Sequence, residues 1–331
     1  MKHLIVLLGP TGVGKTELAL RLAHHLHSPI INADSRQIFA EIPIGTAAPT
    51  PKQQAKKKIP IGTAAPTPKQ QAKAKHYFVG NHHLEDYYSA SMYEQDVLAL
   101  LDRLYKEHDA LLLTGGSMMY IDAVCDGIDD IPTIRDDVRT EMKRRLTEEG
   151  LPALVEELHQ LDPQHWAIVD RNNPRRVVHA LEICHQTGKT YTSFRKQDLR
   201  KQNPGNLSNT RTTPSGTTFD IIKVGLERPR EQLYDRINAR VLDMMNEGME
   251  EEALRVYPLR HLNALNTVGY KELFHYFDGK IDHEEAVRQI QSNTRRYMRK
   301  QMTWFKKDAR IRWFAPDNVE DILKYIDEKT Q

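Results

Sequence analysis

Residues 4–16, LIVLLGPTGVGKT, run from an apolar segment into a glycine-rich turn that ends in Lys15 and Thr16. The apolar segment predicts a buried strand at Leu4–Leu8, and a helix is expected from Thr16 to about Leu26. The turn matches the pattern G-x-x-x-x-G-K-[ST], in which backbone N–H groups and a helix N-terminus surround an anion. We therefore predict a phosphate-binding loop made of Gly9, Pro10, Thr11, Gly12, Val13, Gly14, Lys15 and Thr16.

The same plan of strand, turn and helix recurs twice. PIINADSRQI predicts a strand that ends at Asp34, and HDALLLTGGSMMY predicts one that ends near Thr114 before two glycines. This alternation is typical of an α/β protein with a parallel sheet. Because ligands bind at the carboxyl ends of parallel strands, we expect Lys15, Asp34 and Gly115 to converge. The predicted fold class is a P-loop NTPase-like parallel sheet flanked by helices.

Each side chain near the loop has more than one possible role. Lys15 would place its charge on a terminal phosphate, and the Thr16 hydroxyl could bind Mg²⁺. Asp34 could accept a proton from a nucleophile or support the magnesium shell, or it could simply cap the next helix. Arg228 and Arg230 follow a strand and could reach the phosphates opposite Lys15, or they could belong to an ordinary surface helix.

A nucleotide hydrolase also needs an acidic side chain at the end of a strand to bind magnesium. The strand ALLLTGGS ends without a carboxylate, since Asp109 precedes it. Glu227 ends the strand predicted at 219–227, FDIIKVGLE, but is followed directly by Arg228-Pro229. The loop is thus predicted to bind a phosphate chain, while the set of residues needed for hydrolysis is incomplete.

Residues 128–197 change in character. Segments such as DVRTEMKRRLTEEG and NPRRVVHALEICHQTGK carry apolar residues near every third or fourth position, which predicts helices. We predict a first core part at 1–127, a helical insertion at 128–197, a mobile polar loop at 198–218 and a second core part at 219–331.

One segment is duplicated. IPIGTAAPTPKQQAK occurs at 42–56 and again, without change, at 59–73. Structural repeats usually come in threes or more, so two perfect copies indicate a recent duplication or an artefact. We expect one copy to fold natively and the other to loop out, and the sequence does not say which.

The composition is that of a soluble globular chain. Of 331 residues, 39% are hydrophobic and 28% charged, and the net charge of +2 offers no global argument for nucleic acid. Cys125 and Cys184 form no CxxC pair, which suits a reducing compartment. No apolar stretch approaches the roughly 20 residues of a membrane span. We predict a cytoplasmic, monomeric protein with no membrane partner.

Local basic clusters do suggest a polyanion. The segment 294–313 has eight basic residues and interleaved aromatics, which either stack on bases or face the core of an amphipathic helix. Arg171, Arg175 and Arg176 lie at the start of a predicted helix and suggest a second basic face. The histidines lack the spacing of a metal site.

Taken in order, seven motifs resemble the tRNA dimethylallyltransferase (tRNA isopentenyltransferase) family. They are GPTGVGKT, NADSRQIF with IPIGTAAP, TGGSMMYIDA, NNPRRVVHALEI, PREQLYDRI, NTVGYKEL and TRRYMRKQMTWF. The resemblance implies transfer of a dimethylallyl group from dimethylallyl diphosphate to N6 of the adenosine 3′ of the tRNA anticodon, with Mg²⁺ as cofactor. The phosphates would then be the leaving group, so no hydrolytic acid is needed.

The resemblance also implies roles for single residues. Asp34 would be the general base, Lys15 and Arg230 would neutralise the departing diphosphate, and Thr16 would bind Mg²⁺. Ser117 stands where the family usually has Thr. The residues implied to contact the tRNA anticodon stem-loop are Asp34, Ser35, Arg36, Gln37, Ser117, Arg139, Arg175, Arg176, Val177, Gly269, Tyr270 and Lys271.

Three other readings stay open. An adenylate isopentenyltransferase would share the core but would not need a tRNA clamp, which the basic insertion argues against. A P-loop kinase would use the insertion as a lid. A non-catalytic RNA-binding protein would keep the basic faces but would have no use for Lys15, Thr16 and Asp34 together.

Overall fold

The computed structural model describes residues 1–49, 74–129, 131–195 and 209–331. The chain forms two compact units. The larger unit comprises Met1–Gly127 and Ser208–Gln331, and the smaller one comprises Ile128–Leu207. The boundaries predicted from sequence lay after residues 127 and 197.

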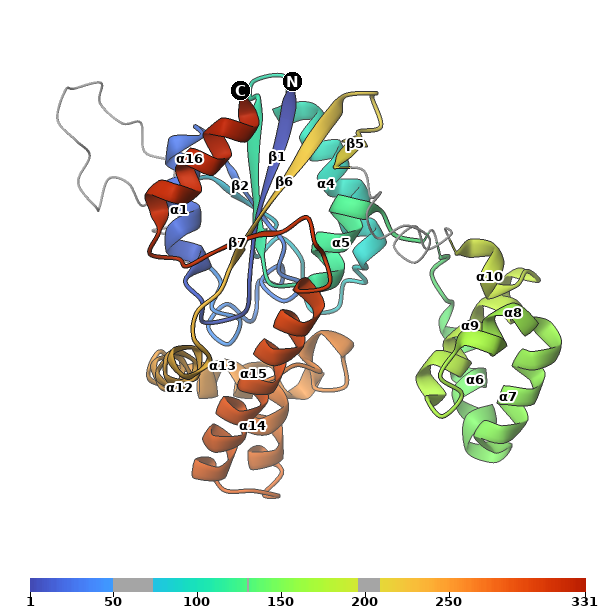
Figure 1. Ribbon diagram of the computed structural model, residues 1–331. Coiled ribbons are helices and arrows are strands. Elements are labelled where there is room, and N and C mark those ends of the chain that lie inside the picture. The colour runs from blue at the N-terminus through green and yellow to red at the C-terminus, as the bar shows by residue number, and fades with distance from the viewer. Residues whose placement is uncertain (50–73, 130, 196–208) are drawn as a thin grey trace, which may run out of the picture. The chain divides into compact units, whose positions relative to one another are not determined.

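Within the described residues, the larger unit is built on a seven-stranded sheet of order β3-β2-β4-β1-β6-β5, with β7 also paired to β6 (Figure 1). All pairs are parallel except β5 with β6. The predicted α/β fold class is confirmed. The strands are β1 Lys2–Leu8, β2 Ile30–Asn32, β3 His76–Tyr77, β4 Ala110–Gly115, β5 Thr210–Thr212, β6 Thr218–Leu226 and β7 Arg312–Phe314.

The central strand β1 is apolar on both faces because helices cover both sides of the sheet. Leu4, Val6 and Leu8 pack with α4 (Ala90–Leu104) and α5 (Met118–Asp126). Ile5 and Leu7 pack on the other face with α1 (Lys15–His25) and α16 (Val319–Thr330). Successive side chains of β1 point to opposite faces of the sheet and therefore belong to two separate cores.

A further group of helices lies beyond the carboxyl ends of the strands (Figure 1). Its core includes Ile38, Ile42, Met249, Tyr270 and Leu273. This third core faces the edge of the sheet at which the phosphate-binding loop was predicted. The helices are α12 Arg230–Asn246, α13 Met249–Val256, α14 Tyr270–Phe277 and α15 His283–Phe305, with short 3₁₀ turns at Tyr257–Leu259 and Asn263–Leu265.

The smaller unit is helical. Its described helices are α6 Asp136–Glu148, α7 Gly150–Leu161, α8 Pro163–Ile168, α9 Pro174–Thr187 and α10 Tyr191–Phe194. Met142, Leu154, Leu158 and Leu181 form part of its own buried core. Asn173 caps α9 by accepting a hydrogen bond from the N–H of Arg176, and Gly188 ends the helix with a positive φ.

The predicted polar loop at 198–218 is wrong at its C-terminal end, while residues 196–208 lie outside the described part. Residues 210–212 form β5, which pairs antiparallel with the beginning of β6. The guanidinium of Arg211 donates to the carbonyl oxygens of Ala123 and Val124 and to the carboxylate of Glu94. These contacts join β5 to the end of α5, so a partly buried arginine holds a segment that looks polar in sequence.

The first copy of the duplicated segment packs into the larger unit over residues 42–49. Ile42 is fully buried, and the amides of Ile44 and Gly45 donate to the carboxylate of Glu252. The second copy, 59–73, lies outside the described residues, so the prediction that it loops out stays untested. Removal of residues 42–58 or of 57–73 leaves the same sequence, so a single-copy variant can be made without choosing between the copies.

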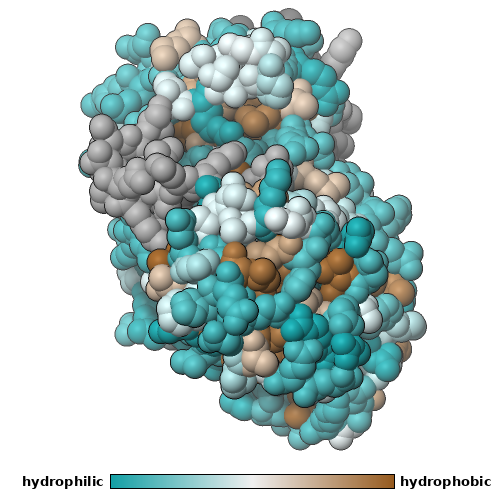
Figure 2. All heavy atoms as spheres, turned by 90° about the vertical axis from the view of Figure 1, so that its right-hand side faces the viewer, coloured by the Kyte–Doolittle hydropathy of each residue, from teal (hydrophilic) through white to brown (hydrophobic). Residues whose placement is uncertain are grey.

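A helix that spans a membrane needs both sufficient length and sufficient apolarity. No described helix is both long enough and apolar enough to cross a bilayer. On the face drawn in Figure 2, hydrophilic side chains cover most of the area and hydrophobic ones appear as small, separate areas.

The tightest backbone approach in the core lies between the ends of β2 and β4. Thr114 O accepts from the N–H of Ala33 at 2.7 Å, and Ala33 O accepts from the N–H of Ser117 at 3.1 Å. A Cβ added at Gly115 would lie 2.2 Å from Ala33 O. Only glycine lets these two strand ends meet, and this contact places Asp34 beside the glycine turn after β4.

Gly115→Ala should therefore lower the free energy of unfolding by more than about 2 kcal/mol, because the clash involves backbone that cannot rotate away. Gly188→Ala is the matched control: its φ is +66° and no atom lies within 4 Å of the added Cβ, so only the left-handed backbone opposes it. That change should cost roughly 1 kcal/mol. Urea unfolding of both variants measures the difference, and equal losses would contradict the close approach.

Candidate functional site

A cavity of about 800 Å³ lies at the carboxyl ends of the strands in the larger unit. Lys15, Asp34 and Gly115 all line it, so the convergence predicted from sequence is confirmed. Its other walls come from α12, from residues 266–271 and from α15. The remaining lining residues used below are Thr11, Gly12, Gly14, Thr16, Ser35, Arg36, Gln37, Gly45, Thr46, Gly116, Arg236, Arg240, Gly269, Lys271, Tyr297 and Gln301.

The phosphate-binding loop closes one end of the cavity. Gly9, Gly12 and Gly14 have positive φ values of 152°, 80° and 111°, which are difficult for other residues, so the glycines are required by the turn. Gly9, Pro10 and Val13 are buried and do not line the cavity, whereas the other five residues of the predicted loop do. The N-terminus of α1 follows at Lys15 and points its free N–H groups toward this end.

The Lys15 ammonium folds back over its own loop. Nζ donates to the carbonyl oxygens of Gly9 and Pro10, both at 2.8 Å. Burial, together with the charge of Arg240, lowers the pKa of Lys15 to about 7, although the charge of Asp34 opposes the shift. The free protein therefore disfavours the protonated form of Lys15. A bound anion would stabilise that form.

Asp34 follows β2 and stands among several cations. Its Oδ1 accepts a hydrogen bond from the backbone N–H of Arg36 at 3.0 Å. Its charge acts on the pKa values of Lys15, Arg36 and Arg240. The local turn satisfies one carboxylate oxygen, so the other remains available to a ligand.

Arg230 does not reach this group. It is exposed at the first turn of α12, where its Nε donates to the hydroxyl of Tyr234. Arg236 and Arg240, one and a half to three turns further along α12, line the cavity instead. Arg236 Nε donates to Gly12 O at 2.7 Å, and within the described chain no hydrogen bond or ion pair engages the guanidinium of Arg240. The helix turns its second and third arginines, and not its first, toward the loop.

The sequence analysis also missed Gln301. This α15 side chain is 1% exposed; its Oε1 accepts from the N–H of Thr11 at 2.9 Å, and its Nε2 donates to Gly116 O at 2.8 Å. An amide is suited to this place because one partner is a donor and the other an acceptor. Gln301 thus fastens the phosphate-binding loop to the turn after β4. Its position in a basic segment hid it.

A magnesium ion fits the cavity through Thr16. This hydroxyl lines the cavity, and no hydrogen bond within the described residues occupies it. Mg²⁺ commonly takes one protein oxygen together with phosphate oxygens and waters, so a single hydroxyl suffices. No group of three or more His, Cys, Asp or Glu side chains suited to a metal occurs among the described residues.

Half of the twelve residues implied to contact tRNA line the cavity. Ser35, Arg36 and Gln37 line it beside Asp34, and Gly269 and Lys271 line another part of its wall. Ser117 lies just behind the glycine turn, at the N-terminus of α5, and is 8% exposed. Ser117 is thus buried and does not itself line the cavity.

Two of the predicted contacts need correction. The side chain of Tyr270 is fully buried, and its hydroxyl donates to Glu252 at 2.5 Å. Val177 is also fully buried, in the core of the helical unit. Neither side chain is available to a macromolecule. Tyr270 and Val177 are each next to accessible residues in the sequence. The motif alone therefore could not distinguish residues that contact tRNA from residues that pack in the core.

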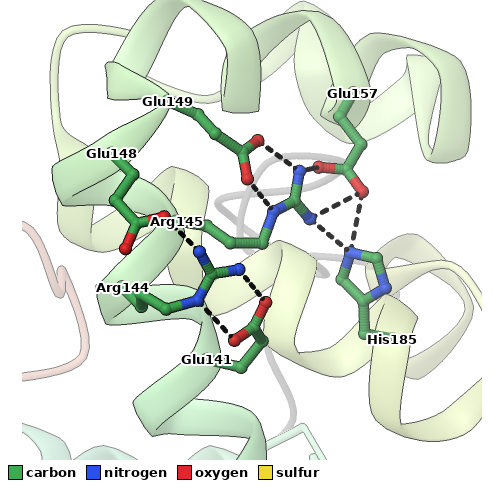
Figure 3. Close-up of polar contacts among 7 residues, drawn as sticks. All are labelled: Glu141, Arg144, Arg145, Glu148, Glu149, Glu157 and His185. Atoms are coloured by element: carbon green, nitrogen blue, oxygen red, sulfur yellow. Dashed lines mark hydrogen bonds and ion pairs between the residues drawn. The ribbon is translucent and has the colours of Figure 1, made fainter.

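The arginines of the helical unit fall into two groups. Arg144 pairs with Glu141 and Glu148, and Arg145 pairs with Glu149 and Glu157 in the network of Figure 3. By contrast, Arg175 and Arg176 are exposed at the start of α9, and no ion pair involves them within the described residues; Arg139 is exposed on α6. The carboxylates of the unit neutralise the first pair and leave the second pair for an anion.

The two interpretations of 294–313 each apply to part of the segment. Phe305 is buried in the main core, and Trp304 donates from Nε1 to Asp122 at 2.7 Å. These aromatics support the helix. Tyr297, however, is 38% exposed and lines the cavity, next to the exposed Arg296 and Lys300. One aromatic and several cations of α15 therefore remain accessible.

The acids considered for hydrolysis lie elsewhere. Glu227 is exposed and pairs with Lys306 at 3.6 Å, and Asp109 pairs with Lys2 at 2.8 Å. Neither lines the cavity. The carboxylates that do line it are Glu17, Asp34 and Asp243, and of these Asp34 is the one that follows a strand end.

Comparison with known proteins assigns a family. Residues 57–308 match the model described as IPP transferase, and residues 2–58 match the one described as Isopentenyl transferase. A tRNA dimethylallyltransferase 1 of Phocaeicola vulgatus is 55% identical over 323 residues, covering 98% of this chain and 97% of the relative. One of Porphyromonas gingivalis is 56% identical over 314 residues, covering 95% and 94%.

Solved structures agree. The tRNA isopentenylpyrophosphate transferase of Bacillus halodurans superposes with a TM-score of 0.66 at 28% identity, covering 100% of this chain and 97% of the other. A eukaryotic dimethylallyltransferase acting on tRNA matches the fold with a TM-score of 0.70 at 21% identity, covering 97% and 75%.

The state of Lys15 gives a pH-dependent prediction. With a pKa of about 7 in the free protein, Lys15 is largely neutral at pH 8, and a bound anion favours the charged form. Binding of inorganic diphosphate with Mg²⁺ should therefore take up a proton at pH 8, and affinity should fall as pH rises through 7. Calorimetry in two buffers of different ionisation enthalpy measures the uptake. Lys15→Arg stays charged and should lose this share of it; equal uptake by both proteins would refute the assignment.

Proposed function

Because this chain belongs to the tRNA dimethylallyltransferase family, we propose that it transfers a dimethylallyl group from dimethylallyl diphosphate to N6 of an adenosine in tRNA. The adenosine is the one on the 3′ side of the anticodon, and diphosphate is released. The observation that carries this proposal is the single cavity, which joins a phosphate-binding loop to a carboxylate at Asp34. An anion and a nucleophile can then meet in the same cavity.

The diphosphate binds at the loop end. Backbone N–H groups of residues 12–16 and the N-terminus of α1 supply fixed partial positive charge. Lys15 and Arg240 supply full charge, and Arg236, anchored on Gly12 O, supports the loop from the side of α12. Negative charge grows on the diphosphate as it departs, so these groups stabilise the transition state more than the ground state.

The reaction exchanges one bond for another. The adenine N6 attacks C1 of the dimethylallyl group, the C1–N6 bond forms and the bond from C1 to the diphosphate oxygen breaks. Asp34 takes the proton that N6 loses. The N–H of Arg36 orients the carboxylate through Oδ1 and leaves the other oxygen for the substrate amine.

Mg²⁺, bound through the Thr16 hydroxyl, would add positive charge at the diphosphate. The rest of the arrangement belongs to the chain itself. Gln301 fixes the start of the loop to the turn after β4, so that the two halves of the cavity keep their separation. This is positioning, and it costs no reorganisation during the reaction.

The tRNA is gripped by basic surfaces on both units. Arg175 and Arg176 at the start of α9 are free to bind phosphates, as are Arg296 and Lys300 on α15. A base must leave its stack to enter a cavity of this kind, and Tyr297 offers an aromatic face at the entrance. Cytoplasmic location and a monomeric state remain predictions from the sequence.

The alternatives fit less well. A kinase or hydrolase needs a strand-end acid for magnesium; Glu227 lies away from the cavity, and the transfer proposed here uses Asp34 as the proton acceptor instead. An enzyme that prenylates free AMP has no use for unpaired arginines on a separate helical unit. Transfer to tRNA accounts for the cavity and the basic faces together.

The test is an incubation with labelled dimethylallyl diphosphate, Mg²⁺, unmodified tRNA with an adenosine 3′ of the anticodon, and AMP in competition. We expect label in the tRNA. Label in AMP would replace the proposal with prenylation of free nucleotide. Label in neither substrate, from the wild-type protein and from the single-copy variant, would reject transfer.

Asp34→Asn should reduce labelling by more than about 100-fold while tRNA binding persists, since only the proton acceptor is lost.

The position of the arginines gives a separate prediction. Arg240→Met should lower kcat for tRNA labelling on the order of 100-fold, because it removes a desolvated cation from the departing diphosphate. Arg230→Met, ten residues earlier on the same helix, is the matched control and should stay within about twofold of wild type. Steady-state kinetics with both variants decides between them. A larger loss at Arg230 would restore the role that the sequence motif suggested.

A further inference from the structure

Glu252 on α13 is a fully buried carboxylate, 0% exposed, that lies outside the cavity. Its Oε2 accepts from the backbone N–H of Ile44 at 2.8 Å, and its Oε1 accepts from the N–H of Gly45 at 2.8 Å. Oε1 also accepts from the hydroxyl of Tyr270 at 2.5 Å. A buried charge is costly unless hydrogen bonds compensate it, so these three donors account for its presence.

The loop that Glu252 binds, residues 42–49, forms part of the cavity wall through Gly45 and Thr46. Its inner side contacts Gln37, whose Nε2 donates to Thr46 O at 2.9 Å and to Ala47 O at 3.1 Å. Gln37 belongs to the segment that begins with Asp34. Contacts therefore run from Glu252 through the loop to the residues that face the reacting base.

Tyr270 connects the same carboxylate to the part of the wall formed by residues 266–271. It begins α14 directly after Gly269, which lines the cavity. A Cβ at Gly45 would lie 2.4 Å from the Tyr270 hydroxyl, so the loop and the helix touch with no space between them. Burial and the charge of Glu252 both raise the pKa of Tyr270, which keeps its hydroxyl protonated as a donor.

The chemistry of this contact is specific for a carboxylate. All three partners present hydrogens, and only an ionised carboxyl group offers acceptors on both oxygens. An amide of the same size would direct an NH₂ group at one of those donors and leave it unsatisfied inside the protein. The loop would then lose one of its two anchors.

We propose that Glu252 is a positioning residue for the tRNA half of the site. It fixes loop 42–49 against α14 from behind, and so sets the distance between the Asp34–Gln37 segment and the 266–271 wall. This rests on the proposed function, since it assumes that the adenosine enters between these walls. The diphosphate half, which is anchored by Gln301, should not depend on it.

The experiment compares Glu252→Gln with Glu251→Gln, a matched control at the exposed neighbouring position of α13. For Glu252→Gln we expect kcat/KM for tRNA to fall roughly tenfold or more, while the Kd for inorganic diphosphate with Mg²⁺ stays within about twofold of wild type. Glu251→Gln should match wild type in both. Equal kinetics for the two variants, or an equal loss of diphosphate affinity and tRNA turnover, would overturn the proposal.

Hydrogen exchange separates this inference from the reaction itself. The amides of Ile44 and Gly45 should exchange faster in Glu252→Gln than in wild type, and unchanged exchange would reject the anchor whatever the enzyme modifies. Absence of tRNA labelling by the wild-type protein would reject the proposed function alone. If Glu252→Gln does not fold, Tyr270→Phe removes one donor and keeps both backbone bonds; a rise of about threefold in KM for tRNA at unchanged diphosphate affinity is expected, and no rise counts against the proposal.

Discussion

The close approach of two strand ends is the constraint on which the site depends. The backbone of Ala33 is hydrogen-bonded to Thr114 and Ser117 and lies so close to Gly115 that it excludes any side chain there. This contact brings the Asp34 carboxylate to the turn after β4, while β1, paired to β4, delivers the phosphate-binding loop to the same edge. A parallel sheet guarantees only that strand ends share an edge. Because Gly115 has no side chain, the end of β2 can also lie directly against the end of β4, which brings Asp34 close to the glycine turn.

The sequence was sufficient for the parts of the site that follow strand ends. Lys15, Asp34 and Gly115 could be placed together because the connection of strand and turn fixes where the next residue goes. Positions along helices were harder, since one face must be chosen from 3.6 residues per turn. Arg230 matched the family motif, yet Arg240 lies on the cavity. Val177 and Tyr270 sit among accessible neighbours but face a core, and only packing reveals that.

The residues that escaped prediction altogether are buried polar side chains. Gln301 and Glu252 each connect segments that are hundreds of positions apart in the chain, and no local pattern, not even the motif that contains Gln301, points to those contacts. Their neighbours in sequence are basic or acidic and indicate a solvated helix face. Both satisfy backbone groups that the turn and the loop cannot satisfy themselves. The cavity is thus defined as much by what lies behind its walls as by what lines it.

The contact of Arg211 has a meaning for how such enzymes diversify. The chain leaves the core after α5 and re-enters it at β5, and this arginine binds the end of the first element to the second. The two connections between the core and the helical unit therefore begin at neighbouring points of the core. A unit whose two connections lie close together can be lengthened, shortened or exchanged without disturbing the sheet, as in tolerated domain insertions. Specificity for the nucleic acid could then evolve through changes in the helical unit, while the residues that carry the reaction stay on the sheet.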